Sequence, residues 1–389
     1  MSTIKVNRIE NTSTTNGGVS IDTDGHVTID GQQLPTAGPL SNRNLIINGA
    51  MTVAQRGTSF TSATDGTFVA DRWKYEKFAP AGAVHTIEQS TDAPAGFTYS
   101  IKATTTTTGT LPAGSFYQFL YHFEAQNISQ IQYGTANAQT LTLSFWVKAK
   151  LAGTYPVSFQ HPLGTRVYPA TYTVNNADTW EYKTVTLAGD TGGTWTMTGN
   201  VAGLRLSFNW GMGSDYTGGT AGAWAAASSF LNLASTSGPD VNGTVGNYIQ
   251  FAGVQLEVGS KATPFEHRSY GQELALCQRY CYRLDVGPGF HFVNAMAYNA
   301  SNVFGSIEFP VTMRSRPTSM TPFGTAADYI ITSWSSQDVC TSLPSLNGSS
   351  TFSAQVQFSS AGNVNAGYAA MGTANTNSIY LIFDGGSEL

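Results

Sequence analysis

Charged residues are scarce in this sequence. They make up 11% of its 389 residues, and 19 basic against 24 acidic side chains leave a formal net charge of -5. An ordinary soluble domain has roughly 25% charged residues. A chain of this kind has no broad positive surface of the sort that phosphate backbones or anionic lipids require. We therefore expect no nucleic acid among its partners.

Cysteine is also scarce, with three residues in the whole chain. An odd number cannot pair completely, and Cys277 and Cys281 stand four positions apart in a helix-like stretch, unlike the loop spacing of a disulfide framework. The six histidines are scattered singly, without the spacing that holds a transition metal. We expect the fold to form without disulfides or zinc.

Long hydrophobic runs are missing. No window approaches the about 20 apolar residues that a membrane-spanning helix needs. The first eight residues contain no apolar stretch like that of a secretion signal. The sequence therefore predicts synthesis in the cytoplasm without a signal peptide, and no membrane insertion.

Recognisable catalytic motifs are missing too, since the sequence has no nucleophile elbow, HExxH helix or phosphate-binding glycine loop. Asp71 and Glu76 lie near Trp73, and glycosidases use such a pair of carboxylates beside aromatic residues, but in a strand the two would point to opposite faces. The structural interpretation is that Asp71 and Arg72 form an ion pair that holds Trp73 in the core. We expect the protein not to be an enzyme and name no catalytic residue.

Turns and strands are what the sequence has in quantity. Its 41 glycines separate stretches of alternating apolar residues, of which residues 141–148 are the clearest. Leu141, Leu143, Phe145 and Val147 would share one face of that strand. Further strands are expected at residues 183–187, 203–208 and 253–257. The pattern predicts a mainly β fold, with a central antiparallel jelly-roll sandwich over residues 41–268.

Residues 1–40 form a separate N-terminal segment. Val19 and Ile21 alternate with polar residues before the turn signal Asp24-Gly25, and Val27 and Ile29 do so after it, which predicts one small hairpin. An isolated hairpin is marginal in water. We expect this one to be ordered by packing against copies of itself or by docking into a larger particle.

One short helix and a small C-terminal β-domain are expected after the sandwich. Ser269 and Gln272 match a capping box, and Leu274, Cys277, Cys281 and Leu284 fall on one helical stripe. These residues predict a connecting helix over 269–284, of roughly three to four turns. Strand-like stretches at 303–309, 351–358 and 378–383 then predict a β-domain over residues 285–389.

Three stretches of the chain carry a family resemblance: residues 44–49 (NLIING), residues 253–268 and residues 309–314 (FPVTMR). Together they resemble bacteriophage tail-fibre proteins that contain a carbohydrate-binding-module-like, galactose-binding-like β-sandwich. The resemblance covers most of residues 41–320. It implies that residues 44–49 and 253–257 are the first and last strands of the sandwich and meet in the fold.

The resemblance also implies a function and partners. The chain would be a subunit of the virion tail fibre that mediates attachment to the bacterial host surface by binding cell-envelope polysaccharide. Residues 1–40 would attach it to phage tail or adaptor proteins, and the subunit would form a homotrimer, with the C-terminal domain at the tip of the fibre.

Two other functions remain open. A structural virion fibre, such as a head fibre or a spacer without receptor contact, would have the same composition and fold. A glycan-degrading tailspike is the enzymatic alternative. Such proteins usually carry a long repetitive β-helix, and no regular period of roughly 20 to 50 residues is visible here.

Aromatic residues in loops are the candidates for glycan binding, because sugar rings stack on flat side chains while their hydroxyls bond to polar neighbours. Trp195 and Trp224 follow glycine-rich stretches, and Trp334 stands among serines and other hydrogen-bonding residues. Tyr216 is included on the same argument. The alternative for a loop tryptophan is that it folds back onto the edge of the sandwich.

The resemblance implies one candidate ion site. Modules of this type often hold a structural calcium between their first and last strands, and Asn48, Gln255 and Glu257 offer oxygen ligands of suitable hardness. Met51 and Thr52 stand where many such modules have an acidic residue. Apart from this possible calcium, we expect no cofactor.

Overall fold

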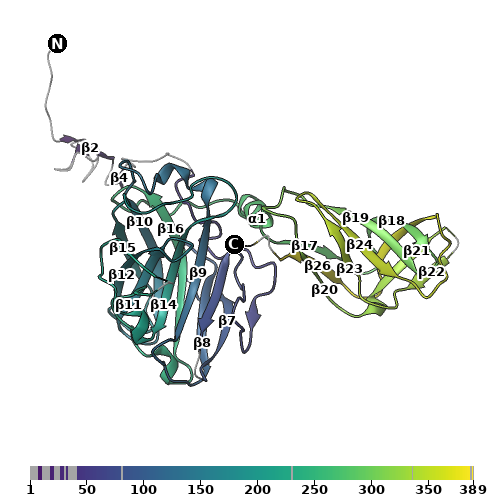
Figure 1. Ribbon diagram of the computed structural model, residues 1–389, viewed down its shortest axis with the longest axis horizontal. Helices are drawn as coiled ribbons and strands as arrows, with labels where there is room; N and C mark the ends of the chain where they lie inside the picture. Colours follow the sequence, from purple (N-terminus) through teal and green to yellow (C-terminus); the bar gives the residue numbers. More distant parts are fainter. Residues whose placement is uncertain are drawn as a thin grey trace, which may run out of the picture. The chain divides into compact units, whose positions relative to one another are not determined.

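The computed structural model describes residues 8–10, 18–21, 27–29, 32–33, 42–79, 82–228, 231–334, 336–385 and 388. The chain divides into two compact units, each described by itself below (Figure 1). Unit 1 comprises Met1–Ala50, Glu76–Thr86 and Ser90–His267, and unit 2 comprises Met51–Tyr75, Ile87–Gln89 and Arg268–Leu389. Unit 2 therefore includes a segment that precedes most of unit 1 in the sequence.

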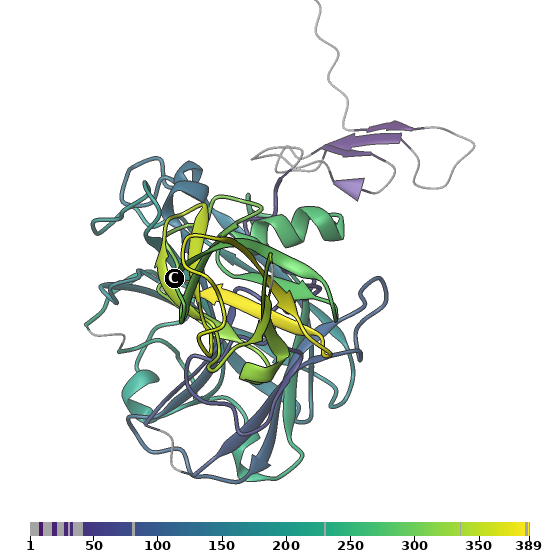
Figure 2. The same ribbon diagram turned by 90° about the vertical axis from the view of Figure 1, so that its right-hand side faces the viewer.

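The described residues of the N-terminal segment form four short antiparallel strands, which lie side by side in Figure 2: β1 (Arg8–Glu10), β2 (Gly18–Ile21), β3 (Val27–Ile29) and β4 (Gln32–Gln33). The predicted hairpin is present as β2 and β3, with Val19 opposite Ile29 and Ile21 opposite Val27. Its predicted turn, Asp24 and Gly25, lies outside the described residues. The sheet is larger than the single hairpin expected, because β1 and β4 pair with its two outer edges.

The rest of unit 1 is an antiparallel β-sandwich, which confirms the predicted architecture. Strands that neighbour each other in a sheet are often far apart in sequence, as in a jelly roll. One sheet has the order β13 (Glu181–Leu187), β10 (Leu141–Ala149), β16 (Tyr248–Val258), β8 (Ser100–Thr107), β7 (Val84–Ser90). The other has the order β15 (Ala225–Ala226), β12 (Arg166–Val174), β11 (Gly153–Gln160), β14 (Ala202–Met212), β9 (Phe116–Glu124), β6 (Trp73–Phe78). Short 3-10 turns lie at Ala125–Asn127, Ser129–Ile131, Ser214–Tyr216 and Val241–Gly243.

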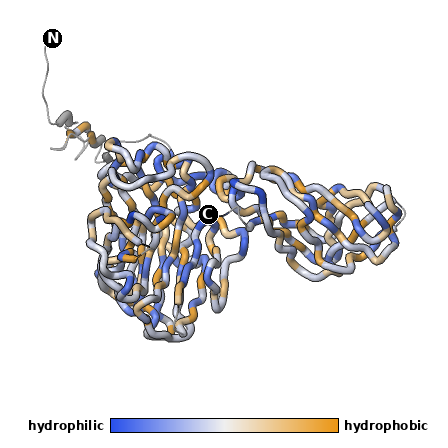
Figure 3. Tube along the Cα trace, viewed as in Figure 1, coloured by the Kyte–Doolittle hydropathy of each residue, from blue (hydrophilic) through white to orange (hydrophobic). Residues whose placement is uncertain are grey.

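Aromatic rings fill the space between the two sheets. Phe208 of β14 packs on Phe145 of β10 and Phe251 of β16, with ring centroids 4.8 and 4.4 Å apart. The four residues predicted to share one face of β10 are fully buried (Leu141, Leu143, Phe145, Val147). Figure 3 shows the alternation of hydrophobic and hydrophilic residues along these strands. Burial of one face of each sheet against the other accounts for the sandwich.

The two segments expected to meet in the sandwich do so. The N–H of Leu45 donates to the carbonyl of Leu256 (2.9 Å), and the side chain of Asn44 bonds to β16 at the carbonyl of Val254 (3.2 Å) and the N–H of Leu256 (3.2 Å). Residues 44–49 are an irregular segment that ends in a turn, whereas a strand was expected. The left-handed backbone of Asn48, with φ at 60°, is incompatible with a continuing strand.

The α-helix found in the described residues, α1 (Tyr270–Gln278), is shorter than predicted. Its capping box is present as expected, because the Ser269 side chain accepts from the N–H of Gln272 and the Gln272 side chain accepts from the N–H of Ser269. The predicted extension to residue 284 is wrong. Residues 282–286 alternate polar and apolar side chains with a period of two, and they pair with another strand instead.

Unit 2 contains two further antiparallel sheets. The smaller has the order β17 (Tyr282–Val286), β26 (Ile379–Asp384), β20 (Ser319–Pro322). The larger has the order β22 (Ser336–Val339), β21 (Tyr329–Ser333), β25 (Ala369–Ala374), β18 (His291–Asn299), β19 (Asn302–Glu308), β24 (Ser353–Ser359), β23 (Ser345–Ser349). A 3-10 turn (Ala326–Asp328) precedes β21, and β5 (Ser59–Phe60) pairs with Ile87 and Glu88. The sheets share an apolar core that includes Val356, Phe358, Leu381 and Phe383.

Asp71 and Arg72, predicted to form an ion pair, take partners from other segments of unit 2. Asp71 accepts hydrogen bonds from the backbone and side chain of Gln55 and lies 3.9 Å from the guanidinium of Arg56. Arg72 pairs with Glu388, and its guanidinium lies 3.6 Å from the centroid of the Tyr280 ring. Burial raises the pKa of Asp71, and the Arg56 charge opposes that rise. Trp73 is fully buried, as expected.

Candidate functional site

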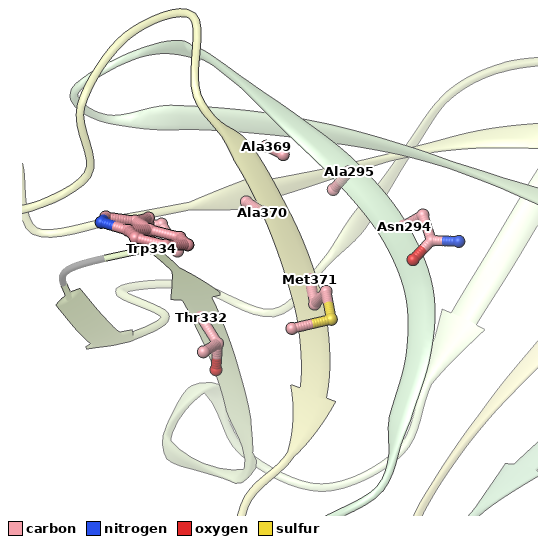
Figure 4. Close-up of a pocket in the computed structure, with 8 residues that line it drawn as sticks. Asn294, Ala295, Thr332, Trp334, Ala369, Ala370 and Met371 are labelled. Carbon is pink, nitrogen blue, oxygen red and sulfur yellow. The ribbon is translucent and has the colours of Figure 1, made fainter.

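Trp334 lies in the turn between β21 and β22 and is 93% exposed. It lines one end of an open groove of about 450 Å³, shown in Figure 4. The groove crosses the end of β21, the start of β25 and the middle of β18. Its lining is apolar with a few polar groups: Asn294, Ala295, Thr332, Ser333, Trp334, Ala369, Ala370 and Met371. None of these side chains carries a charge.

The strand register explains how the groove is built. Thr332 lies opposite Met371, and Met371 lies opposite Asn294, so these three side chains form one row across the outer face of the sheet. The hydroxyl of Ser333 lies 2.8 Å from that of Ser336 and ties together the two ends of the turn that carries Trp334. An indole face, the Ser333 hydroxyl and the Asn294 amide thereby line one hollow, a combination that suits a ligand with both apolar and hydroxyl surfaces.

The same sheet exposes further large apolar side chains. Met296 and Tyr298 of β18 are more than half exposed, as is Tyr368, which directly precedes β25. Met296 lies opposite Ala369, one of the residues that line the groove. The groove is thus part of an apolar outer face, and such faces on soluble proteins mark sites of interaction.

Trp195 and Trp224, the two loop tryptophans of unit 1, fold back onto the edge of the sandwich. Their rings contact each other at 5.5 Å between centroids, and both contact Tyr133. The indole N–H of Trp224 donates to the carbonyl of Ala188 (2.7 Å). Both rings are partly exposed. This geometry agrees with the alternative interpretation, in which a loop tryptophan packs on the sandwich edge.

Asp190 holds this aromatic cluster in place. Its carboxylate accepts two hydrogen bonds from the Arg166 guanidinium (2.8 and 2.5 Å) and one from the indole N–H of Trp195 (3.1 Å). Burial raises the pKa of the Tyr133 hydroxyl and lowers the pKa of His161, whose ring packs on Trp195 at 4.8 Å. The polar groups here are mostly engaged within the protein, which leaves the partly exposed ring faces as the surface for a ligand.

Tyr216 is 7% exposed. Its ring packs in a small apolar cluster with Val167, Met212 and Leu233, and edge-on against Phe116. Little of the ring is open to a sugar. Of the four aromatic candidates, the structure brings Trp195 and Trp224 together, buries Tyr216, and leaves Trp334 in unit 2 at a groove of its own.

The candidate calcium ligands Gln255 and Glu257 lie side by side on β16, but their groups are already engaged. Both carboxylate oxygens of Glu257 accept hydrogen bonds from Thr263, one from its N–H (2.8 Å) and one from its hydroxyl (2.7 Å). The Gln255 amide oxygen accepts from the N–H of Glu266 (2.8 Å), and its amide N–H donates to Glu257 (2.9 Å). Asn48 is fully buried beside Gly49. This donor set fits the closure of a loop and does not fit a calcium ion, which needs six or more oxygens with free lone pairs.

One buried polar cluster was missed by the sequence reasoning. It lies on the face of the β9, β14 and β11 sheet that points away from the aromatic core. The hydroxyls of Ser158 and Ser207 lie 2.7 Å apart, and the amide N–H of Gln160 donates to both. Within the described part of the chain, the amide oxygens of Gln118 and Asn209 are buried without a hydrogen-bond partner. Alternation with the core aromatics in these strands was the signal that could have found them.

The described residues contain neither a cluster of metal ligands nor a membrane-spanning helix. No three His, Cys, Asp or Glu side chains gather there as metal ligands would. The helices of the described part are too short or too polar to cross a bilayer.

Neither a family model nor a curated protein sequence matches the chain. Among solved structures, the chain is similar to the enzymatically active domain of tailspike protein 4 of bacteriophage CBA120, with 14% identity and a TM-score of 0.28 over 51% of this chain. The chain spans about a fifth (21%) of that tailspike chain.

Two smaller structures give similar values. A family 11 carbohydrate-binding module of a cellulosomal cellulase of Clostridium thermocellum is 9% identical, with a TM-score of 0.26 over 54% of this chain and 98% of that chain. A putative sugar binding protein from Bacteroides thetaiotaomicron is 14% identical, with a TM-score of 0.28 over 56% of this chain and 100% of that chain. We assign the chain to no family from likenesses of this size.

Proposed function

We propose that the protein is a subunit of a bacteriophage tail fibre and attaches the virion to its bacterial host by binding cell-envelope glycan, without catalysis. The observation that carries the proposal is the groove at Trp334, where a 93% exposed indole lines one end and Ser333 and Asn294 supply polar groups to the same lining. A sugar ring stacked on the indole would remove apolar surface from water, while its hydroxyls would exchange hydrogen bonds with the polar groups.

The lining of the groove also favours a neutral ligand. Its eight residues carry no charge, so a charged group entering it would lose hydration without gaining a partner. Its volume of about 450 Å³ lies within the range of about 300 to 1,000 Å³ found for ligand sites. A neutral sugar of a surface polysaccharide meets both conditions.

Assembly would strengthen such a site. We propose that the subunit forms a homotrimer in the virion and that residues 1–40 attach it to phage tail or adaptor proteins. A few stacking contacts and hydroxyl bonds give a weak single site, and several linked copies acting on one polysaccharide raise the overall affinity by about 10² to 10⁴ without new contacts. Light scattering of the purified chain measures the mass of the assembly and would contradict the trimer if it gave a monomer.

Replacement of the exposed indole tests the function directly. We expect Trp334→Ala to lower binding to an array of bacterial envelope polysaccharides about tenfold or more, because the stacking surface is lost. The matched control is Phe352→Ala, which removes another exposed aromatic ring of unit 2 that is not part of the groove lining. Circular dichroism checks that both variants fold.

The same experiment separates the proposal from a structural fibre without receptor contact. Full binding and full virion adsorption by Trp334→Ala would remove the groove from the function and favour the structural role. Release of reducing sugar from the polysaccharide by the wild-type protein would contradict the non-catalytic part of the proposal.

A further inference from the structure

We propose that unit 2 carries a second sugar-binding groove, centred on Arg283 and Asp285 and separate in its lining residues from the groove at Trp334. Its ligand class is a neutral hexopyranose ring, and that class rests on the proposed glycan-binding function. The assignment of the groove itself rests on the geometry of the sheet formed by β17, β26 and β20 (Figure 1).

An aromatic platform forms one side of this groove. Tyr380 of β26 lies directly opposite Asp285 of β17, and the N–H of Phe323, just after β20, donates to the carbonyl of Tyr380 (2.9 Å). These three residues therefore form one row across the sheet. The rings of Phe323 and Tyr380 stack at 4.4 Å between centroids with 12° between their planes, and Phe323 is 51% exposed. The face of Phe323 that points away from Tyr380 is the flat apolar surface that suits the C–H face of a sugar ring.

Arg283 covers the Tyr380 ring and forms the charged end of this stack. Its guanidinium lies 3.9 Å from the centroid of the Tyr380 ring. It donates two hydrogen bonds to one carboxylate oxygen of Asp285, Oδ1 (2.8 and 2.6 Å), and a third to the carbonyl of Gln55 (3.2 Å). The side chain is thus held in one orientation by two neighbouring segments of the unit.

The remaining carboxylate oxygen of Asp285 is the hydrogen-bonding group of the site. Both bonds from Arg283 go to Oδ1, and the Asp285 side chain is 64% exposed, so Oδ2 faces water and can accept sugar hydroxyls. Arg283 neutralises the carboxylate, so the pair has no net charge to attract an anion or a cation. An acidic sugar would bring its carboxylate next to that of Asp285, and a neutral ring is therefore the better occupant.

Two hollows share the Arg283 and Asp285 pair in their linings. One, of about 380 Å³, is lined by Phe323, Tyr380 and Ser378 together with the pair. The other, of about 200 Å³, is lined by the pair together with residues that include Tyr270 and Gln278 of α1. Because both hollows share the pair, a glycan of more than one ring can continue from the platform toward the helix.

Single sugars are the probes that test this groove apart from the polysaccharide site. Saturation-transfer NMR on the full chain would use the methyl glycosides of glucose, galactose and mannose, with methyl glucuronide as the acidic comparison. We expect a signal from at least one neutral glycoside that weakens about tenfold in both Phe323→Ala and Asp285→Asn. Trp334→Ala supplies the cross-check, and Phe352→Ala is the control for loss of an exposed ring.

The outcomes separate the two sites. A signal that survives Trp334→Ala and is lost in Phe323→Ala supports the second groove, even if polysaccharide binding at Trp334 fails. A signal lost in Trp334→Ala and unchanged in Phe323→Ala overturns the second groove and leaves the proposed function standing. A stronger signal from the glucuronide than from every neutral glycoside overturns the ligand class. No signal from any glycoside in the wild-type protein overturns the second groove.

Discussion

His85 shows at the scale of one residue how the sandwich of unit 1 holds a polar group inside. The ring is fully buried, packs edge-on against Tyr117 at 5.0 Å and Trp210 at 6.0 Å, and shares a hydrogen bond of 2.9 Å with the side chain of Asn242. Burial lowers the pKa of His85 to about 4, although the bond to Asn242 acts in the opposite direction. The ring is therefore neutral in the folded protein above that pH.

Unit 1 should lose stability as the pH falls from about 6.5 to about 4. In the unfolded chain a histidine protonates near pH 6.5, whereas folded His85 resists protonation until about pH 4, so the unfolded state binds more protons in this window. The contribution is fully present above pH 6.5 and its loss reaches about 3 kcal/mol near pH 4. Urea unfolding at several pH values, followed by tryptophan fluorescence, measures it.

A variant of His85 measures how much of this pH dependence comes from that residue. We expect His85→Gln to flatten the pH dependence between 6.5 and 4, because glutamine does not titrate and can still bond to Asn242. His291→Gln is the matched control, since His291 is exposed and lies in unit 2. An equal slope in wild type and His85→Gln would assign the effect to other groups.

At the scale of one element, β16 and the loop that follows it show how the sandwich of unit 1 is closed. Gln255 and Glu257 project from the same side of the strand, bond to each other, and hold residues 263–266 by three short hydrogen bonds. The ends of the sandwich are thereby joined through side chains and backbone. An ion is not needed for this closure.

We therefore expect the melting temperature to be unchanged by EDTA. Glu257→Gln, in contrast, should destabilise unit 1 by about 1 to 2 kcal/mol, because hydrogen bonds to a charged carboxylate are replaced by weaker ones. Differential scanning calorimetry with and without chelator, on wild type and variant, gives both results. A melting temperature that falls in EDTA and recovers with added calcium would show that the loop does hold an ion.

Elements with a strong local pattern could be predicted from the sequence. The alternation in residues 141–148 specified β10 and its buried face, and the capping box placed the start of α1 at Ser269. The end of α1 could not be predicted, because Leu284 fits a helical stripe and a strand equally well, and only pairing with β26 decides between them. Element type in such a stretch depends on partners distant in sequence.

The candidate site was predictable only in part for a related reason. The polar surroundings of Trp334 pointed to an exposed turn, and the residue is exposed. Tyr216 could not be recognised as buried, because its neighbours Val167 and Leu233 come from separate segments. The Arg283 and Asp285 groove gave no local signal, since Tyr380 and Phe323 join it through strand pairing. The contacts that form these sites join residues that are far apart in the sequence, so local patterns could not predict them.

At the scale of the whole molecule, unit 2 is built from discontinuous segments. Arg56 lies 3.1 Å from Asp384 and 3.3 Å from Glu388, and Arg72 also pairs with Glu388. Both arginines come from residues 51–75, and both acidic partners come from the C-terminal end of the chain. A cut of the chain near residue 268 would therefore separate the partners of several buried ion pairs.

A fragment of residues 268–389 should consequently fold poorly by itself. It would keep Asp384 and Glu388 and lose both arginines, and removal of one partner from a buried ion pair typically costs about 3 to 5 kcal/mol. That is a large part of the about 5 to 15 kcal/mol that stabilises an ordinary domain. We expect a broad, non-cooperative thermal transition and rapid proteolysis of the fragment, measured against the full chain. A cooperative melt at the temperature of the full chain would show that residues 51–75 are dispensable. If the fragment behaves as expected, loss of glycan binding on truncation reports unfolding, and the two grooves must be compared by point variants in the full chain.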